Sequence, residues 1–135
     1  MSKTMIMEFH DAKLEQLAIR AETVNAEFSH ACVFVEVGPE KYECWSYRVA
    51  IELIGSTNVA VAGRLAPNDS IGDGWITRLD GTREAMGPVG TAIACREFRC
   101  EFASGTTITI EASTAVMRPI ERLRFLENWN GPLGI

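Results

Sequence analysis

The clearest pattern of apolar and polar positions along the chain lies in residues 96–112. Within this range, apolar residues alternate with charged or hydroxyl residues in two runs. This period of two, with aromatic and β-branched residues in it, predicts two half-buried strands. The apolar positions of the two runs are Phe98, Cys100, Phe102, Ile108 and Ile110.

The connection between these two runs can be predicted as well. If residues 103–105 form a three-residue loop, Phe102 lies opposite Thr106 and the apolar residues of both runs share one face. A two-residue loop would shift the register by one residue and mix the faces. Gly105 occupies the position where a three-residue hairpin loop requires a left-handed residue. The pattern therefore predicts an antiparallel hairpin.

Other segments also favour strands. Apolar residues fall on both phases of residues 28–37, which indicates a central strand that is covered on both sides. We expect residues 1–12 to be a short lead-in and residues 23–26 to form a turn. The remaining predicted strands are residues 14–22, residues 44–53 with their long clean alternation, residues 59–65, residues 75–79, and a strand that starts near residue 93 and runs into the hairpin.

The least regular part of the chain is residues 66–94. We expect a loop from Pro67 to Gly74 and at most one helical turn at residues 82–86, because Gly87, Pro88 and Gly90 prevent a longer helix.

The segment 119–129 has two interpretations. Pro119 can start a helix in which Ile120, Leu123 and Leu126 share one face. Alternatively, the segment is a last strand, which we favour because all that precedes it is β and the segment is short for a helix. Together the patterns predict an all-β fold: a single domain, residues 1–135, folded as one antiparallel β-sandwich or partly open barrel of about seven strands.

Composition narrows the classes of function. The formal net charge of −5 and the scattered basic residues argue against nucleic-acid binding. No apolar run approaches the roughly 18 residues of a membrane-spanning helix, and no leader peptide is visible. The four cysteines include no C-x-x-C pair, and two of them lie within apolar strand patterns. We therefore expect reduced cysteines in a cytoplasmic protein, without a metal or another cofactor.

Four residues are the candidates for a binding site: His10, Asp11, Trp75 and Trp129. His10–Asp11 is the only neighbouring pair of a histidine and an acid. Adjacent side chains seldom interact productively, so a catalytic relay would need a third group from elsewhere in the fold. The tryptophans would contribute to a partner surface where they stay exposed.

For three other candidate sites the sequence favours a structural role over a functional one. Residues 69–80 resemble a calcium-binding loop only in part, because Ile71 replaces a ligand and Asp80 replaces the bidentate glutamate. We expect Asp and Gly to supply turn geometry there. His30 is predicted to be a core or edge histidine, and Glu97 and Glu111, opposite each other in the hairpin, are predicted to be solvated.

A resemblance adds to this picture. The opening Phe9-His10-Asp11-Ala12-x-Leu14, the late Phe102-x-Ser104 before a β run that ends in Glu111-Ala112, and the closing Trp129-x-Gly131-Pro132-Leu133 resemble small bacterial all-β proteins. Some of those proteins are similar to immunity proteins of toxin systems. The resemblance implies a bacterial, cytoplasmic β-sandwich and assigns no functional residue.

The sequence thus predicts a non-enzymatic, immunity-like binding domain whose partner is another protein or a second copy of the chain. The alternative is a small-ligand-binding or hydrolytic half-barrel in which residues 66–94 form the mouth of the pocket. Neither function involves nucleic acid, a membrane or a cofactor.

Overall fold

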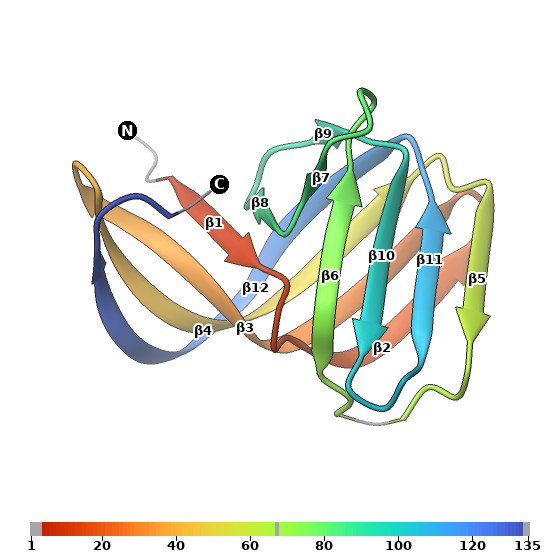
Figure 1. Cartoon of the computed structure of the whole chain (residues 1–135), viewed down its shortest axis with the longest axis horizontal. Coiled ribbons are helices and arrows are strands. Elements are labelled where there is room, and N and C mark those ends of the chain that lie inside the picture. Colours follow the sequence, from red (N-terminus) through yellow and green to blue (C-terminus); the bar gives the residue numbers. More distant parts are fainter. Residues whose placement is uncertain (1–3, 67, 134–135) are drawn as a thin grey trace.

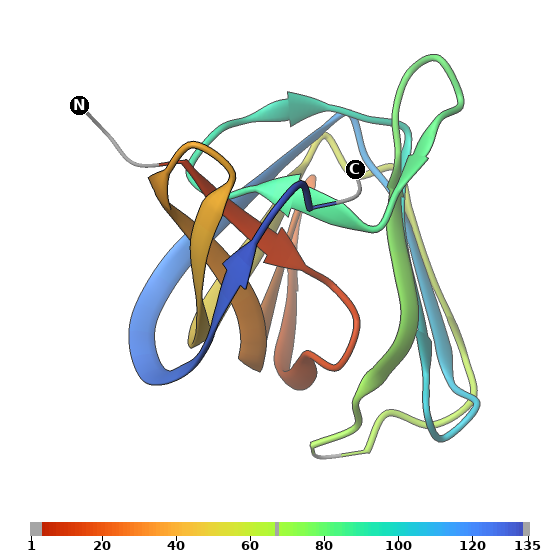
Figure 2. The same ribbon diagram turned by 60° about the vertical axis from the view of Figure 1, so that its left-hand side comes forward.

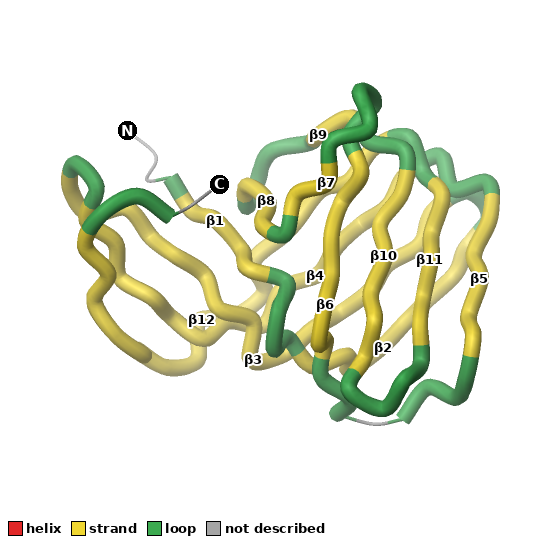
Figure 3. Tube along the Cα trace, in the orientation of Figure 1, coloured by secondary structure: helices red, strands yellow, loops and turns green. Residues whose placement is uncertain are grey.

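A computed structural model describes residues 4–66 and 68–133. Every regular element in this part of the chain is a strand, and the strands form two antiparallel sheets (Figures 1 and 3). The predicted all-β, sandwich-like fold is confirmed. The strands are β1 (Met5–Glu8), β2 (Lys13–Arg20), β3 (Thr23–Gly38), β4 (Lys41–Ile54), β5 (Asn58–Ala62), β6 (Ile71–Thr77), β7 (Arg83–Glu84), β8 (Met86–Pro88), β9 (Ile93–Ala94), β10 (Glu97–Phe102), β11 (Thr107–Glu111) and β12 (Thr114–Asn130).

The larger sheet has seven strands and is built on the three longest ones, β3, β4 and β12. Its order is β8-β1-β3-β4-β12-β9, and β2 also pairs with β3. β2 pairs with the first half of β3, up to Ser29, and β1 pairs with the second half, from Cys32 to Val35. The turn between β1 and β2 therefore lies beside the middle of β3.

The smaller sheet has the order β5-β11-β10-β6-β7 and covers one end of the long strands (Figures 1 and 2). The second half of β3, the first half of β4 and the second half of β12 extend beyond it and curl; we call this part of the larger sheet the wing. Both described ends of the chain lie on the side of this wing.

The hairpin β10–β11 has the predicted register. Phe98 lies opposite Ile110, and the backbone N–H of Phe102 donates to the carbonyl of Thr106 at 2.8 Å. Gly105 has a φ of 93°, the left-handed conformation that the three-residue loop requires. The alternation of apolar and polar residues was therefore sufficient to predict this pairing.

The core lies between the two sheets. Its centre is three fully buried phenylalanines from distant parts of the chain: Phe9 after β1, Phe28 in β3 and Phe98 in β10. The ring of Phe98 meets those of Phe9 and Phe28 edge to face, with centroids 5.5 and 6.4 Å apart. This geometry adds an electrostatic gain to the burial of apolar area.

The prediction of about seven strands missed several short ones. The lead-in at residues 1–12 contains β1, and the irregular segment 66–94 contains β7 and β8 in place of a helical turn at residues 82–86. The strand predicted at residues 75–79 is β6, which starts earlier, and the strand predicted to run from residue 93 into the hairpin is interrupted, because β9 lies in the larger sheet and β10 in the smaller one. The loop predicted for residues 67–74 is shorter because β6 starts at Ile71, while Pro67 itself lies outside the described residues.

Glycines explain part of this error. A Cβ on Gly74 would lie 3.2 Å from the Cβ of Phe9, and one on Gly87 would lie 2.6 Å from the Cε of Met117. These glycines are strand residues because the core leaves no room for a side chain, not because the chain turns there.

A bulge explains the pattern of β3. The turn predicted at residues 23–26 belongs to this strand, and the chain turns at Ala21–Glu22 instead. Between Phe28 and Ala31 the register against β4 shifts. Because of this bulge Phe28 and Ala31, three positions apart, are both buried in the core cluster. The apolar residues at both odd and even positions of this strand are thus explained in part by the bulge, which reverses the faces of the residues that follow it. Phe34 is nevertheless buried on the face opposite to that of Ala31 and Val33.

The segment 119–129 is a strand, as favoured above. β12 is bulged relative to β4 at three places, between Pro119 and Glu121, between Arg122 and Arg124, and between Phe125 and Glu127. The residues skipped by the pairing are Ile120, Leu123 and Leu126. Their spacing of three, which also suits a helix, thus reflects three successive bulges.

Candidate functional site

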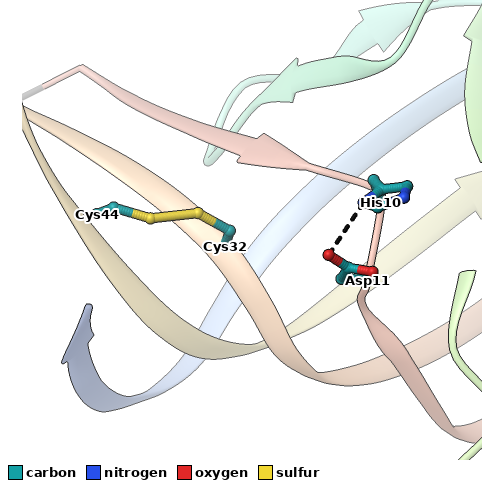
Figure 4. Close-up of a disulfide and its surroundings, with 4 residues drawn as sticks. All are labelled: His10, Asp11, Cys32 and Cys44. Carbon is teal, nitrogen blue, oxygen red and sulfur yellow. Dashed lines mark ion pairs between the residues drawn. A yellow bond between two sulfur atoms is a disulfide. The ribbon is translucent and has the colours of Figure 1, made fainter. Parts of the chain in front are cut away.

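His10 and Asp11 occupy the turn between β1 and β2. Asp11 has a φ of 69°, and its N–H donates to the carbonyl of Ile71 at 2.8 Å, which fixes the turn to the smaller sheet. In this conformation Nδ1 of His10 lies 3.0 Å from Oδ2 of Asp11 (Figure 4). The expectation that these neighbours do not interact is therefore wrong, because the left-handed residue turns one side chain toward the other. Both side chains are more than half exposed.

His30 was predicted to be a core or edge histidine; it lies at the bulge of β3 and is exposed, so the core alternative is wrong. Its φ is 55°, and its Nδ1 lies 2.9 Å from Oγ of Ser29. The bulge lies beside the β1–β2 turn, because β1 and β2 follow each other along β3. The fold thus brings both histidines to the same side of the larger sheet.

A disulfide joins Cys32 of β3 to Cys44 of β4 (Figure 4). The two Cα atoms are 6.3 Å apart, within the usual range for a disulfide. The prediction of four reduced cysteines is therefore wrong for this pair. A hairpin turn at residues 38–41 brings the two positions together, although they are 12 residues apart in the sequence. Cys95 and Cys100 are free and buried.

Trp129 lies near the end of β12 and is 41% exposed. Its ring meets that of Phe34 edge to face, with centroids 6.3 Å apart, and Phe34 meets Tyr42 in the same way at 6.5 Å. The indole N–H donates to the carbonyl of Pro132 at 3.4 Å. The segment after β12 therefore folds back on the wing.

These groups line one cavity of about 370 Å³, which we call the wing pocket. It contains three of the four predicted site residues. Its lining residues are Glu8, His10, Asp11, His30, Cys32, Phe34, Cys44, Met86, Leu126, Glu127, Trp129 and Leu133.

Trp75, the fourth candidate, does not line the wing pocket. It lies on β6 opposite Arg99 of β10, on the face of the smaller sheet that points away from Ile76 and the core. The guanidinium carbons of Arg83 and Arg99 lie 4.9 and 5.9 Å from its ring centroid. Its indole N–H is buried and has no hydrogen-bond partner among the described residues. These contacts give Trp75 a packing role on the outer face.

Glu8 is the pocket residue that the sequence did not single out. It lies on β1, opposite Cys32 of β3 and Met86 of β8, and its side chain is half-buried. Burial raises the pKa of Glu8 above the usual range of a glutamate; the charge of His10 lowers it and that of Asp11 raises it further. A lone polar residue at the end of a short strand carries no periodic signal, so only the fold reveals it.

The residues of the partial calcium motif serve other purposes. Half of residues 69–80 is strand β6. Asp69 accepts hydrogen bonds from the backbone N–H and the hydroxyl of Ser104, and Asp80 accepts one from the N–H of Thr82 at 2.9 Å. This last bond lowers the pKa of Asp80. The expected turn role agrees with the contact of Asp80, whereas Asp69 connects its loop to the loop between β10 and β11.

Comparison with known protein families, with curated proteins and with solved structures found no significant match.

The disulfide predicts a distinct pattern of thiol chemistry. When the oxidised protein is unfolded without reductant, we expect iodoacetamide to modify Cys95 and Cys100 only. In the folded protein we expect neither to react, because burial raises the pKa of both thiols and shields them. Peptide mass spectrometry identifies the modified residues. Modification of four cysteines without reductant would contradict the disulfide.

Reduction should also affect stability. The double variant Cys32→Ser/Cys44→Ser removes a cross-link that closes a loop of about a dozen residues. We expect the free energy of unfolding in urea to fall by about 3 kcal/mol, the size typical of such loops. The reduced wild-type protein is the matched control and should lose a similar amount.

Glu8 predicts a dependence of stability on pH. Its folded pKa is raised, so the folded state holds the proton more tightly than the unfolded chain. The free energy of unfolding is then largest below the unfolded pKa and falls as the pH rises through the folded pKa. Because Glu8→Gln removes this loss, we expect the variant to gain more stability over wild type at pH 7 than at pH 4. Urea unfolding followed by tryptophan fluorescence measures this difference; an equal difference at both pH values would contradict it.

Proposed function

We propose that the protein is a non-enzymatic binding domain whose partner is a protein, and that the second half of β12 is the docking surface. One observation carries the proposal: every residue from Arg118 to Asn130 is exposed, although this stretch belongs to one of the three longest strands. Five large apolar side chains in it are 39% to 46% exposed, namely Ile120, Leu123, Phe125, Leu126 and Trp129. Exposed apolar patches of this kind mark interaction surfaces.

The backbone of this stretch is open along one edge. The other edge pairs with β4 over the whole length of β12. On the open side, β9 pairs only with Thr114 and Ala115, and Val89 bridges Met117. Beyond Met117 no described residue pairs with this edge as a strand. Free N–H and C=O groups next to apolar side chains favour the addition of a strand from a partner.

The stretch is held firmly against its own sheet. Phe125 meets Trp45 of β4 edge to face, with centroids 5.4 Å apart, and the guanidinium of Arg122 lies 4.2 Å from the centroid of the same indole ring. These contacts fix the strand before a partner binds. A rigid surface loses less conformational entropy on binding.

The spacing of the apolar residues supports a second copy of the chain as the partner. Ile120 and Leu126 lie three residues to either side of Leu123. Two antiparallel copies related by a twofold axis at Leu123 therefore place these apolar residues together. Such self-complementarity is the property that a symmetric dimer interface requires.

The lining of the wing pocket supports binding rather than catalysis. Its described lining residues include no Ser, Thr or Lys, and its two cysteines are joined to each other. Among these residues His10 has no hydroxyl or free thiol to activate, and the hydroxyl beside His30 is that of Ser29, which is buried and is not one of them. The resemblance to immunity proteins agrees with a protein partner, and a bacterial, immunity-like role remains a prediction from that resemblance.

The cytoplasmic location was expected partly from reduced cysteines. The Cys32–Cys44 disulfide removes that argument, because disulfides persist mainly in oxidising compartments. The resemblance alone now supports the cytoplasm. Among the described residues there is no helix long and apolar enough to cross a membrane.

Light scattering after size-exclusion chromatography tests self-association. We expect a dimer for the wild type and a monomer for Leu123→Lys, because a charge at the centre of the interface would be buried without a partner. The matched control is Leu79→Lys, at a position 57% exposed and away from β12, which should remain a dimer. A monomeric wild type would contradict self-association, and an unchanged Leu123→Lys dimer would contradict the β12 surface.

A second candidate function rests on another cavity. A groove of about 720 Å³ is lined by Thr4, Ile6, Arg78 and residues 82–88, most of them from the segment that we predicted as the mouth of a pocket. Its size suits a small ligand. Under this alternative, the protein binds a small molecule there.

A thermal-shift screen against metabolites and divalent ions tests this second candidate. A ligand that binds the native state raises the melting temperature by mass action. If the groove is the site, one compound should give a reproducible rise that Ala85→Trp, at an exposed lining position, abolishes, while Leu79→Trp keeps it. If no compound shifts the melting temperature, or if the shift survives in Ala85→Trp, the groove is not the site.

A further inference from the structure

The wing pocket has an uneven balance of charge. Among its described lining residues three are carboxylic acids, Glu8, Asp11 and Glu127, and none is Lys or Arg. The two histidines are each engaged locally, His10 with Asp11 and His30 with Ser29. The pocket therefore carries net negative charge at neutral pH, focused in a concave site.

One of these carboxylates lacks a partner. Glu8 forms no ion pair or side-chain hydrogen bond with any described residue, although its side chain is half-buried at the end of β1, between β3 and β8. Burial of an unpaired carboxylate is costly, and a cation placed beside it offsets that cost. The same burial raises the pKa of Glu8.

The rest of the lining is apolar and aromatic. Phe34 and Trp129 form one wall, and Leu126, Met86 and Leu133 complete the surface around them. Aromatic rings attract organic cations through their electron-rich faces, and aliphatic side chains pack against an alkyl stem. Simple metal ions would gain nothing from these walls. In addition, no cluster of metal-ligating side chains occurs in the described part of the chain.

We propose that the wing pocket binds an organic cation, an alkylammonium or guanidinium group on an aliphatic stem. Glu8 pairs with the charged group inside the pocket, and Glu127 and Asp11 supply negative charge at its rim. Phe34, Trp129 and Leu126 hold the stem. The volume of about 370 Å³ is large enough to hold a group of the size of a lysine or arginine side chain.

Nuclear magnetic resonance titration of the full chain tests this assignment. The probes are pentylammonium and agmatine, with the neutral pentanol and the anionic pentanoate as controls of similar shape. We expect saturable shifts of the backbone amides around Glu8, Cys32 and Trp129 with both cations, at an affinity at least about tenfold higher than for pentanol. Equal affinity for pentylammonium and pentanol, or shifts confined to other residues, would overturn the proposal.

Charge-neutralising variants test the role of the carboxylates. Glu8→Gln and Glu127→Gln should each weaken binding of pentylammonium, and the double variant by about tenfold or more. Glu97→Gln is the matched control, because Glu97 lies on β10 in the other sheet and does not line this pocket. Glu127 is exposed, so its variant tests the proposal independently of the change in stability that Glu8→Gln brings. Unchanged affinity in the folded double variant would overturn the pairing.

The same titration distinguishes two sources of the cation. An acetylated and amidated Gly-Lys-Gly peptide carries the ammonium on a polypeptide backbone. Tighter binding of this peptide than of pentylammonium would identify a side chain of a partner protein as the occupant. Tighter binding of pentylammonium would identify a free amine. Failure of both probes to bind would overturn the proposal.

Discussion

The contact of Phe98 with Phe9 and Phe28 is the interaction on which the arrangement of the two sheets depends. The three rings come from the hairpin of the smaller sheet, from the turn after β1 and from the central strand of the larger sheet. Because all three are fully buried, they fix the distance between the sheets and the position of the β1–β2 turn. That turn carries His10 and Asp11. The core and the wing pocket are therefore connected through Phe9, which is next to His10 in the chain.

The disulfide has a comparable role in the wing, where the smaller sheet does not cover the long strands. A two-sided sandwich buries its strands against a second sheet, but the wing has no such cover. There the structure relies on the covalent link between Cys32 and Cys44 and on aromatic pairs such as Trp45 with Phe125. The wing pocket thus lies where a disulfide and aromatic contacts, rather than a hydrophobic core, hold the strands together. This arrangement leaves apolar side chains open to solvent while their backbone stays fixed.

Features that depend on local patterns of residues were predicted from the sequence, whereas features that depend on which strands are neighbours were not. The hairpin register was predicted because alternation on two strands permits a single pairing that keeps the faces separate. Strands β1, β7 and β8 were missed, and β6 was predicted to start at Trp75 rather than at Ile71, because short strands and glycines at close approaches carry no periodic signal. His10, Asp11 and Trp129 were selected from their chemistry, and the fold brings them together. Glu8 and the disulfide were missed because both depend on which strands are neighbours, which local patterns do not reveal.

The three bulges of β12 have a consequence for the shape of the wing. From Pro119 to Glu127 this strand uses nine residues against the six residues of β4 from Cys44 to Val49. Where neighbouring strands bend together, the strand on the outer side of the bend needs more residues than its inner neighbour. The three additional residues of β12 supply this extra length. The curvature is therefore encoded as a difference in length between neighbouring strands. Loss of a single residue in this stretch would remove one bulge, shift the pairing of the residues that follow and turn their side chains to the opposite face of the sheet.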